Sequence, residues 1–159
     1  RLDTVAGKHN DIGGPCDLEG ARFIDPENAM VGPLNSYGCL FNTSFLFTLT
    51  NHYRIGFAAG VDVKGMAAAW KGIGIDLLLR QRLVYAKPEE YAEDCKLLGG
   101  QLIVPMHHDA AFDWNADMNA YARDVNGLLR QDGVPMAMFN PQRLKWYKVQ
   151  TSICAEAML

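Results

Sequence analysis

Apolar and polar positions follow a regular pattern after residue 40 and predict alternating strands and helices. Apolar residues alternate through Leu40–Thr50 and again through Tyr53–Ala59, and Asn51-His52 between them is typical of a turn. These segments predict a β-hairpin whose turn histidine lies in solvent. Val63–Trp70 is short and rich in alanine, which favours a helix, and Ile75–Leu79 is an apolar run that predicts a buried strand.

A second helix is predicted to begin at Lys87-Pro88-Glu89-Glu90. Proline suits the first turn, and the two acids favour the positive end of the helix dipole. Tyr91, Cys95 and Leu98 fall on one face of this helix, and Gly99-Gly100 is typical of its end. The next strand is predicted at Leu102–Val104. A third helix is predicted from apolar residues at helical spacing, followed by Gly133 as a terminator: Trp114, Met118, Tyr121, Val125 and Leu128.

The order of the elements predicts the fold class. Leu2–Ala6 has the character of a strand end, and two closing strands are predicted at Pro135–Phe139 and Leu144–Val149, joined at Asn140-Pro141. A hairpin, then helices alternating with strands, then a final pair of strands favours an α/β fold with a mixed sheet covered by helices. Residues 1–159 are therefore interpreted as a single domain, with a long Gly- and Pro-rich loop at residues 8–36, a kind of loop that is usually functional or disordered.

Composition and charge exclude several partners. The chain has 159 residues, of which 49% are hydrophobic, which is enough for a real core. Its net charge of −3 gives no electrostatic basis for binding nucleic acid or an anionic membrane, and no apolar run is long enough to cross a bilayer. The chain starts at Arg1 without Met, which suggests a processed, split or truncated polypeptide.

The cysteines bear on the cellular compartment. They are scattered and include no Cys-x-x-Cys pair, so a zinc finger or redox motif is not expected. We interpret them as reduced thiols of a cytoplasmic protein, with Cys95 on the buried face of a helix. The four are Cys16, Cys39, Cys95 and Cys154.

Candidate chemistry follows the predicted strands. In Leu102–Asp109 an apolar run leads through proline into His107, His108 and an acid. His9 follows the first strand, and Asp62 follows the second strand of the hairpin. Imidazole is a common transition-metal ligand, and ligands far apart in sequence converge when they leave the same edge of a sheet. Each residue also has an ordinary explanation, as a loop histidine or, for Asp62, as the N-cap of the next helix.

Three segments together resemble a known family. They are Val5–Asp11, Phe41–Asp62 and Lys87–Asp109, and the last, which ends in Gly-Gly-Gln-Leu-Ile-Val-Pro-Met-His-His-Asp, is the most specific. In this order they resemble the C-terminal portion of a metallo-β-lactamase-fold hydrolase, in the branch that includes lactonase-like and phospholipase-D-like enzymes. The resemblance implies the C-terminal half of an αββα metallo-β-lactamase-like sandwich.

The resemblance also implies a function. His9, Asp62 and His107 would bind one or two zinc ions, with manganese or iron as other choices, and Asp62 would bridge two ions. A metal-bound hydroxide would attack an ester or lactone, an amide or a phosphodiester in a small-molecule substrate. Asp62, His108 and Asp109 are the expected catalytic residues, the last two through contact with substrate or with the metal ligands.

Two departures from the family pattern favour a different function. The family's first motif, His-x-His-x-Asp-His, is absent, and Gly60-Val61-Asp62 stands where the family has Gly followed directly by Asp. The alternative is a non-catalytic binding or assembly module on the same fold. In either case we expect a companion chain or a missing N-terminal half, and hence an oligomer, because half of a sandwich leaves one sheet face uncovered. A Ser or Cys nucleophile has little support, since no serine lies in a Gly-x-Ser-x-Gly turn.

Overall fold

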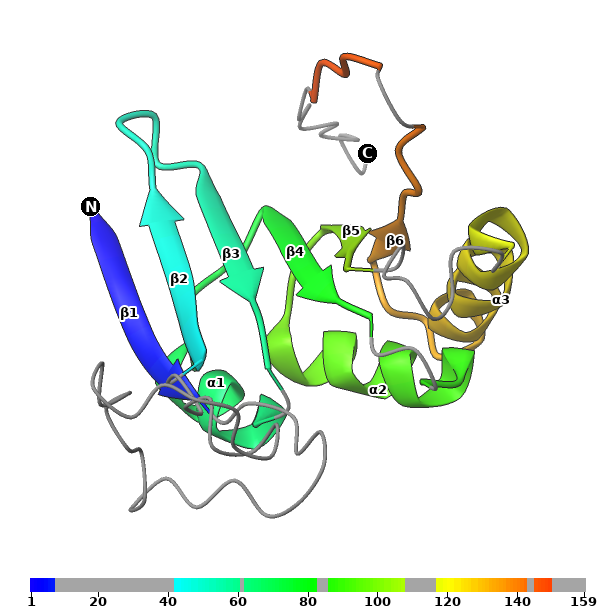
Figure 1. The fold of residues 1–159 in the computed structure, drawn as a ribbon, viewed down its shortest axis with the longest axis horizontal. Helices are drawn as coiled ribbons and strands as arrows, with labels where there is room; N and C mark the ends of the chain where they lie inside the picture. Colours follow the sequence, from blue (N-terminus) through cyan, green and yellow to red (C-terminus); the bar gives the residue numbers. More distant parts are fainter. Residues whose placement is uncertain (8–41, 61, 83–85, 108–116, 143–144, 150–159) are drawn as a thin grey trace, which may run out of the picture.

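The structure is a computed structural model, and its described residues form one mixed six-stranded sheet whose strand order follows the chain, β1 to β6 (Figure 1). This confirms the predicted α/β class. The strands are β1 Leu2–Gly7, β2 Asn42–Thr48, β3 Arg54–Ala58, β4 Leu77–Gln81, β5 Leu102–Met106 and β6 Ala137–Met138. The residues that the structure describes are 1–7, 42–60, 62–82, 86–107, 117–142 and 145–149.

Strand direction decides which loops share an edge. β1 is antiparallel to β2, and β2 is antiparallel to β3. From β3 to β6 all neighbours are parallel. β1 therefore runs in the same direction as β3, β4 and β5, and Figure 1 shows the arrowheads of β1, β3 and β4 pointing to the same edge. We call the edge at which these strands end the carboxyl edge; the β2–β3 turn lies at the opposite edge.

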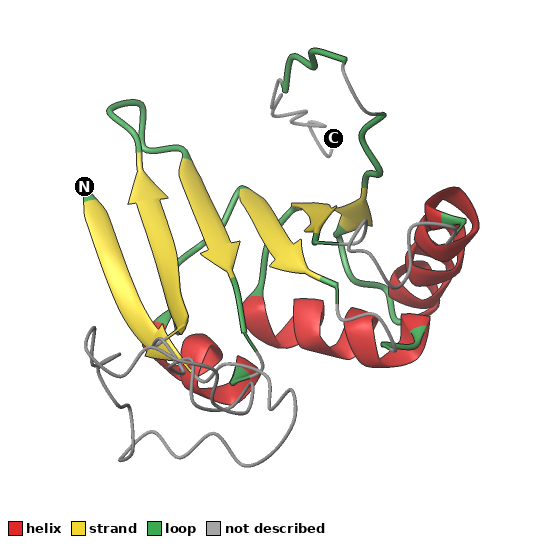
Figure 2. Cartoon of the chain, in the orientation of Figure 1, coloured by secondary structure: helices red, strands yellow, loops and turns green. Residues whose placement is uncertain are grey.

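Three helices of the described chain pack on the sheet: α1 Val63–Ala69, α2 Pro88–Leu98 and α3 Met118–Gln131 (Figure 2). Lys87 is the N-cap of α2, and its backbone N–H donates to the Glu90 carboxylate at 3.4 Å, so the helix begins where the sequence predicts. Tyr91, Cys95 and Leu98 are all buried, which confirms the predicted face. Other core residues come from the sheet and from α3: Leu46, Leu78, Ile103, Val125 and Leu129.

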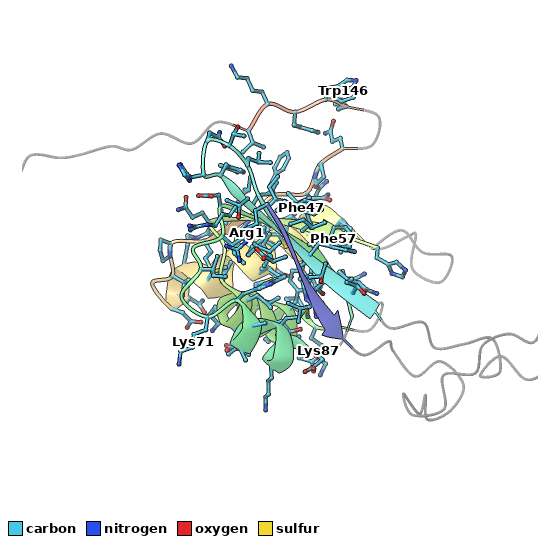
Figure 3. The ribbon with its side chains drawn as sticks, turned by 90° about the vertical axis from the view of Figure 1, so that its left-hand side faces the viewer. Arg1, Phe47, Phe57, Lys71, Lys87 and Trp146 are labelled. Carbon is cyan, nitrogen blue, oxygen red and sulfur yellow. The ribbon has the colours of Figure 1, made fainter. Side chains whose placement is uncertain are left out.

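The two faces of the sheet differ. Alternate strand residues such as Leu46, Leu78 and Ile103 are buried beneath the helices. Side chains on the other face are mostly apolar and are exposed at least in part, and no helix of the described chain covers them. Figure 3 shows the helical layer, where Lys71 and Lys87 are labelled, on one side of the strands that carry Phe47 and Phe57. The residues of this open face are Phe45, Phe47, Ile55, Phe57, Leu77, Leu79, Leu102 and Val104.

Most predicted elements are confirmed, and two strands lie differently from the prediction. The hairpin, the first strand and all three helices are present. β4 is Leu77–Gln81 rather than Ile75–Leu79, because its ladder partners on β3 and β5 begin opposite Leu77. β5 extends past the predicted Leu102–Val104 to Met106, which pairs with Gln81. The ends of a strand are set by where its neighbours pair with it, so the apolar runs alone predicted the wrong ends.

Of the two predicted closing strands, Pro135–Phe139 is confirmed in part, and Leu144–Val149 was wrong over its described residues, 145–149. Only Ala137–Met138 forms a strand, and it pairs with β5 in parallel. Residues 145–149 are exposed and form no strand, and Trp146 is 101% exposed. A strand-like composition does not suffice, because an extended segment needs a neighbouring strand to satisfy its backbone. Leu144, Trp114 and the loop at residues 8–36 lie outside the described residues.

Candidate functional site at the carboxyl edge of the sheet

The strands that precede the three predicted metal ligands all end at the carboxyl edge. Asp62 follows the end of β3, and His107 follows β5 directly. His9 comes two positions after β1, and it lies outside the described residues, as do His108 and Asp109. In the sheet order, one strand separates β1 from β3 and one separates β3 from β5, so the axes in each of these pairs lie about 10 Å apart, and those of β1 and β5 about 20 Å apart, at the usual strand spacing. Convergence on one ion therefore requires the loops after the strands to lean toward each other.

Asp62 is the N-cap of α1, as the sequence analysis allowed. Its Oδ1 accepts a hydrogen bond from the Gly65 N–H at 3.0 Å. A carboxylate has two oxygens with several lone pairs, so the cap leaves acceptor capacity for another partner. Capping and metal binding are compatible uses of this side chain.

His107 has an unusual backbone. Its φ is 60°, in the left-handed region, and its side chain is exposed. The sheet remains intact up to the preceding residue, because the Arg82 N–H donates to the Met106 carbonyl at 2.9 Å. A side-chain-bearing residue with positive φ carries a cost and is found more often at functional sites. His52 also has positive φ, 64°, and is exposed at the β2–β3 turn, which confirms its predicted place in solvent.

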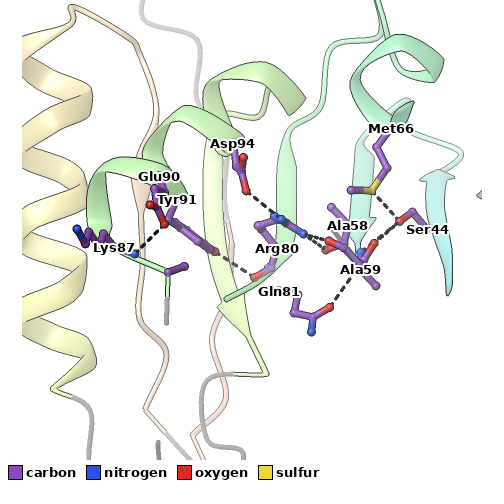
Figure 4. Close-up of polar contacts among 12 residues, drawn as sticks. Ser44, Ala58, Ala59, Met66, Arg80, Gln81, Lys87, Glu90, Tyr91 and Asp94 are labelled. Carbon is purple, nitrogen blue, oxygen red and sulfur yellow. Dashed lines mark hydrogen bonds and ion pairs between the residues drawn. The ribbon is translucent and has the colours of Figure 1, made fainter. Parts of the chain in front are cut away.

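A group of buried and partly buried polar side chains surrounds the end of β3 (Figure 4). Arg80 is 1% exposed, and its Nη1 donates to the carbonyls of Ala58 at 3.3 Å and Gly60 at 2.8 Å. The Ser44 hydroxyl accepts from the Ala59 N–H at 3.2 Å and lies 3.0 Å from the Ala59 carbonyl. We call Ser44, Arg80 and Gln81 the β3 clamp, since Gln81 Oε1 accepts from the Gly60 N–H at 2.9 Å.

The Arg80 side chain is held from a second side. Its Nη2 forms an ion pair with Asp94 Oδ2 of α2 at 3.0 Å. The Tyr91 hydroxyl donates to the Arg80 carbonyl at 3.0 Å. In the described part of the structure, Arg80 Nε is buried without a hydrogen-bond partner. Leaving one N–H of a buried guanidinium without a partner costs free energy. The hydrogen bonds and the ion pair that Arg80 does form fix where its side chain lies.

The β3 clamp was not predicted from the sequence. The available signal was the charge in Leu77-Leu78-Leu79-Arg80-Gln81, because strict alternation places Arg80 on the same face as Leu78. Reading that segment as a buried strand ending at Leu79 left both polar residues outside it. Ser44 carried no comparable signal in the sequence.

Two other ionisable groups lie near this region but do not fit acid–base work near neutral pH. Burial raises the pKa of Cys95 to about 12, against the opposing effect of Arg80, so its thiol stays protonated. Burial likewise raises the pKa of Tyr121 to about 12, although Arg82, which lies 4.5 Å from the Tyr121 ring centre, acts in the opposite direction. Cys95 is therefore poorly suited to act as a nucleophile near neutral pH.

The donor set of Asp62 and His107 is one that transition metals accept. Within the residues that the structure describes, no three His, Cys, Asp or Glu side chains are grouped closely enough to hold a metal ion. The described pair would need a further ligand, and His9 is the predicted one. In the same described part of the chain, no helix is both long and apolar enough to cross a bilayer. Neither a family model nor a curated protein sequence matches the chain.

Proposed function

We propose that the chain is a metal-dependent hydrolase whose site lies at the carboxyl edge. The observation that carries the proposal is topological: β1, β3 and β5, which precede His9, Asp62 and His107, all end at this edge. Active sites of open α/β sheets lie at the carboxyl ends of their strands. The proposed ligands are these three residues, with zinc as the metal and manganese or iron as alternatives.

The protein's own groups have distinct proposed tasks. A bound divalent metal supplies Lewis acidity and makes water a better nucleophile near neutral pH. His107 presents an exposed imidazole, and Asp62 an oxygen beyond the one used in its cap. His108 and Asp109 would contact a small-molecule substrate or orient the ligands. The bond cleaved would be an ester or lactone, an amide or a phosphodiester.

The finer fold assignment belongs to the same proposal. In an αββα sandwich of the metallo-β-lactamase type, the helix-free face of this sheet would pack against a second sheet. The apolar open face supports such an arrangement, because a monomer rarely leaves a large apolar patch in water. The second sheet would come from a companion chain or from a further part of the same polypeptide.

The test uses two histidines with the same backbone conformation. Wild-type protein and the variants His107→Ala and His52→Ala are titrated with zinc by calorimetry, and each is assayed against lactone, amide and phosphodiester substrates. Both substitutions act on an exposed residue with positive φ, so their effects on folding should match. We expect zinc binding and turnover to be lost only in His107→Ala. Equal zinc affinity in both variants would refute the metal assignment.

A non-catalytic assembly module is the second candidate, and the open face is the observation that favours it. Under this alternative the apolar side chains of β2, β3, β4 and β5 bind another protein chain, and His9 and His107 bind no metal. Native mass spectrometry distinguishes the two candidates. A complex with a second chain but without zinc, even after exposure to excess metal, would favour the module; retained zinc favours the hydrolase.

A further inference from the structure

We infer that the β3 clamp is a positioning device for Asp62, with Arg80 as its central residue. The inference deepens the proposed function and rests on it for its consequence at the metal. Its structural basis is independent of any metal: three side chains from the two strands beside β3 bind the backbone just past the last ladder pair. Figure 4 shows Ser44 on one side of Ala58–Ala59 and Arg80 on the other.

The clamp supplies hydrogen bonds to the backbone of β3 beyond the point where the sheet ladder ends. The β3–β4 ladder stops at the pair Ala58–Arg80, so the next backbone groups have no strand partner. Ser44 then binds Ala59, while Gln81 and Arg80 bind the N–H and the carbonyl of Gly60. Gly60 is buried and has φ of 86°, so this is also where the chain turns toward α1. Unpaired polar groups at a buried turn would be costly, and the clamp satisfies them.

Asp62 lies between two fixed points. Upstream, the clamp holds the backbone of Ala58–Gly60; downstream, the Met66 N–H donates to the Asp62 carbonyl at 3.2 Å and the Gly65 N–H to its carboxylate. A carboxylate with both neighbouring segments held has little freedom to leave the carboxyl edge. A ligand misplaced by a fraction of an ångström binds a metal more weakly, which is why supporting contacts matter as much as ligand identity.

The choice of arginine follows from geometry. One planar guanidinium reaches the Ala58 carbonyl, the Gly60 carbonyl and the Asp94 carboxylate at the same time. A lysine has a single nitrogen on a flexible stem and cannot span the three acceptors in the same way. An apolar residue would suit the buried face of β4 better for stability but would remove the side-chain donors that Arg80 supplies to both carbonyls.

The experiment compares Gln81→Ala and Arg80→Lys with Ile103→Val, a conservative change at a 0% exposed core position on β5. Amide hydrogen exchange is measured by NMR without metal, and zinc affinity by calorimetry with zinc alone. Gln81→Ala removes one hydrogen bond from a partly buried side chain and is expected to fold. In both clamp variants we expect exchange at Gly60 and Gly65 to rise at least tenfold relative to the Ile103→Val control.

Zinc affinity should fall by about tenfold or more in the clamp variants, in the range typical of lost supporting contacts. It should stay within twofold of wild type in Ile103→Val. Faster exchange with unchanged zinc affinity would show that the clamp does not position a ligand. Unchanged exchange at Gly65 would show that it does not hold Asp62 at all. If wild-type protein binds no zinc, the proposed function fails, and exchange at Gly65 still decides whether the clamp holds Asp62.

Discussion

Replacing Gly65 with alanine tests the contact that orients Asp62. A β-carbon at Gly65 would lie 2.9 Å from Asp62 Cγ and closer still to its Oδ2, well inside contact distance. The carboxylate is the end of a flexible side chain and can rotate away. It then loses the hydrogen bond from the Gly65 N–H, which is 3.0 Å long in the native structure. The substitution therefore displaces the carboxylate without removing it.

Two effects of similar size oppose each other. Alanine in place of glycine favours a helix by about 0.5–1 kcal/mol. Loss of an aspartate N-cap costs about 1 kcal/mol. In the wild-type background we expect Gly65→Ala to leave the free energy of unfolding nearly unchanged. In the Asp62→Ala background there is no cap to lose, and the same substitution should stabilise the protein by about 0.5–1 kcal/mol.

A double-mutant cycle measures the difference. Wild type, Asp62→Ala, Gly65→Ala and the double variant are unfolded in urea under conditions where the transition is two-state. The structure predicts a coupling free energy of about 1 kcal/mol between the two positions. Additive effects, with Gly65→Ala stabilising both backgrounds equally, would refute the capping geometry and the argument that Asp62 is held from the α1 side.

Three further predictions concern the core and its ionisable groups. Leu129→Ala, at a 0% exposed position of α3, should lower the free energy of unfolding by about 2–5 kcal/mol in urea titrations. As a control, Arg130→Ala at the exposed neighbouring position should change it by less than about 0.5 kcal/mol. Cys95 should resist iodoacetamide at pH 8 in folded protein and react only in denaturant, as read by site-resolved mass spectrometry; rapid native labelling would contradict its burial. Folding raises the pKa of Cys95 from 9.0 to about 12 and that of Tyr121 from 10.0 to about 12, so the unfolded chain loses protons first. Stability should therefore fall between about pH 9 and 12, less steeply in Cys95→Ala, and a flat profile would argue against the raised pKa values.

The helices are the elements that the sequence predicts best, because their signals are local. Proline and two acids at the start of α2 and Gly99 after its end act within one or two turns of the helix. Tyr91, Cys95 and Leu98 share one face as a consequence of helical periodicity alone. The β2–β3 hairpin is equally local, since its turn and both strands lie within residues 42–58. Predicting these elements required no information about distant parts of the chain.

The candidate site was predicted only in part. The sequence placed His107 and Asp62 after strands, and the structure agrees, with Asp62 also serving as an N-cap. Whether these residues bind metal stays a prediction, together with the roles of His9, His108 and Asp109. The β3 clamp was not predicted, because Arg80 and Ser44 act on a backbone segment that neither of them adjoins in sequence.

The sequence by itself determined the three helices and the β2–β3 hairpin, since capping, turns and helical periodicity depend on neighbouring residues. Tertiary structure decided where β4 ends, that residues 145–149 form no strand, and that Arg80 lies buried against the end of β3. The physical reason is that a strand is completed by hydrogen bonds to another strand, and a buried charge by acceptors brought to it from elsewhere. Both partners are distant in sequence and become neighbours only when the sheet has formed.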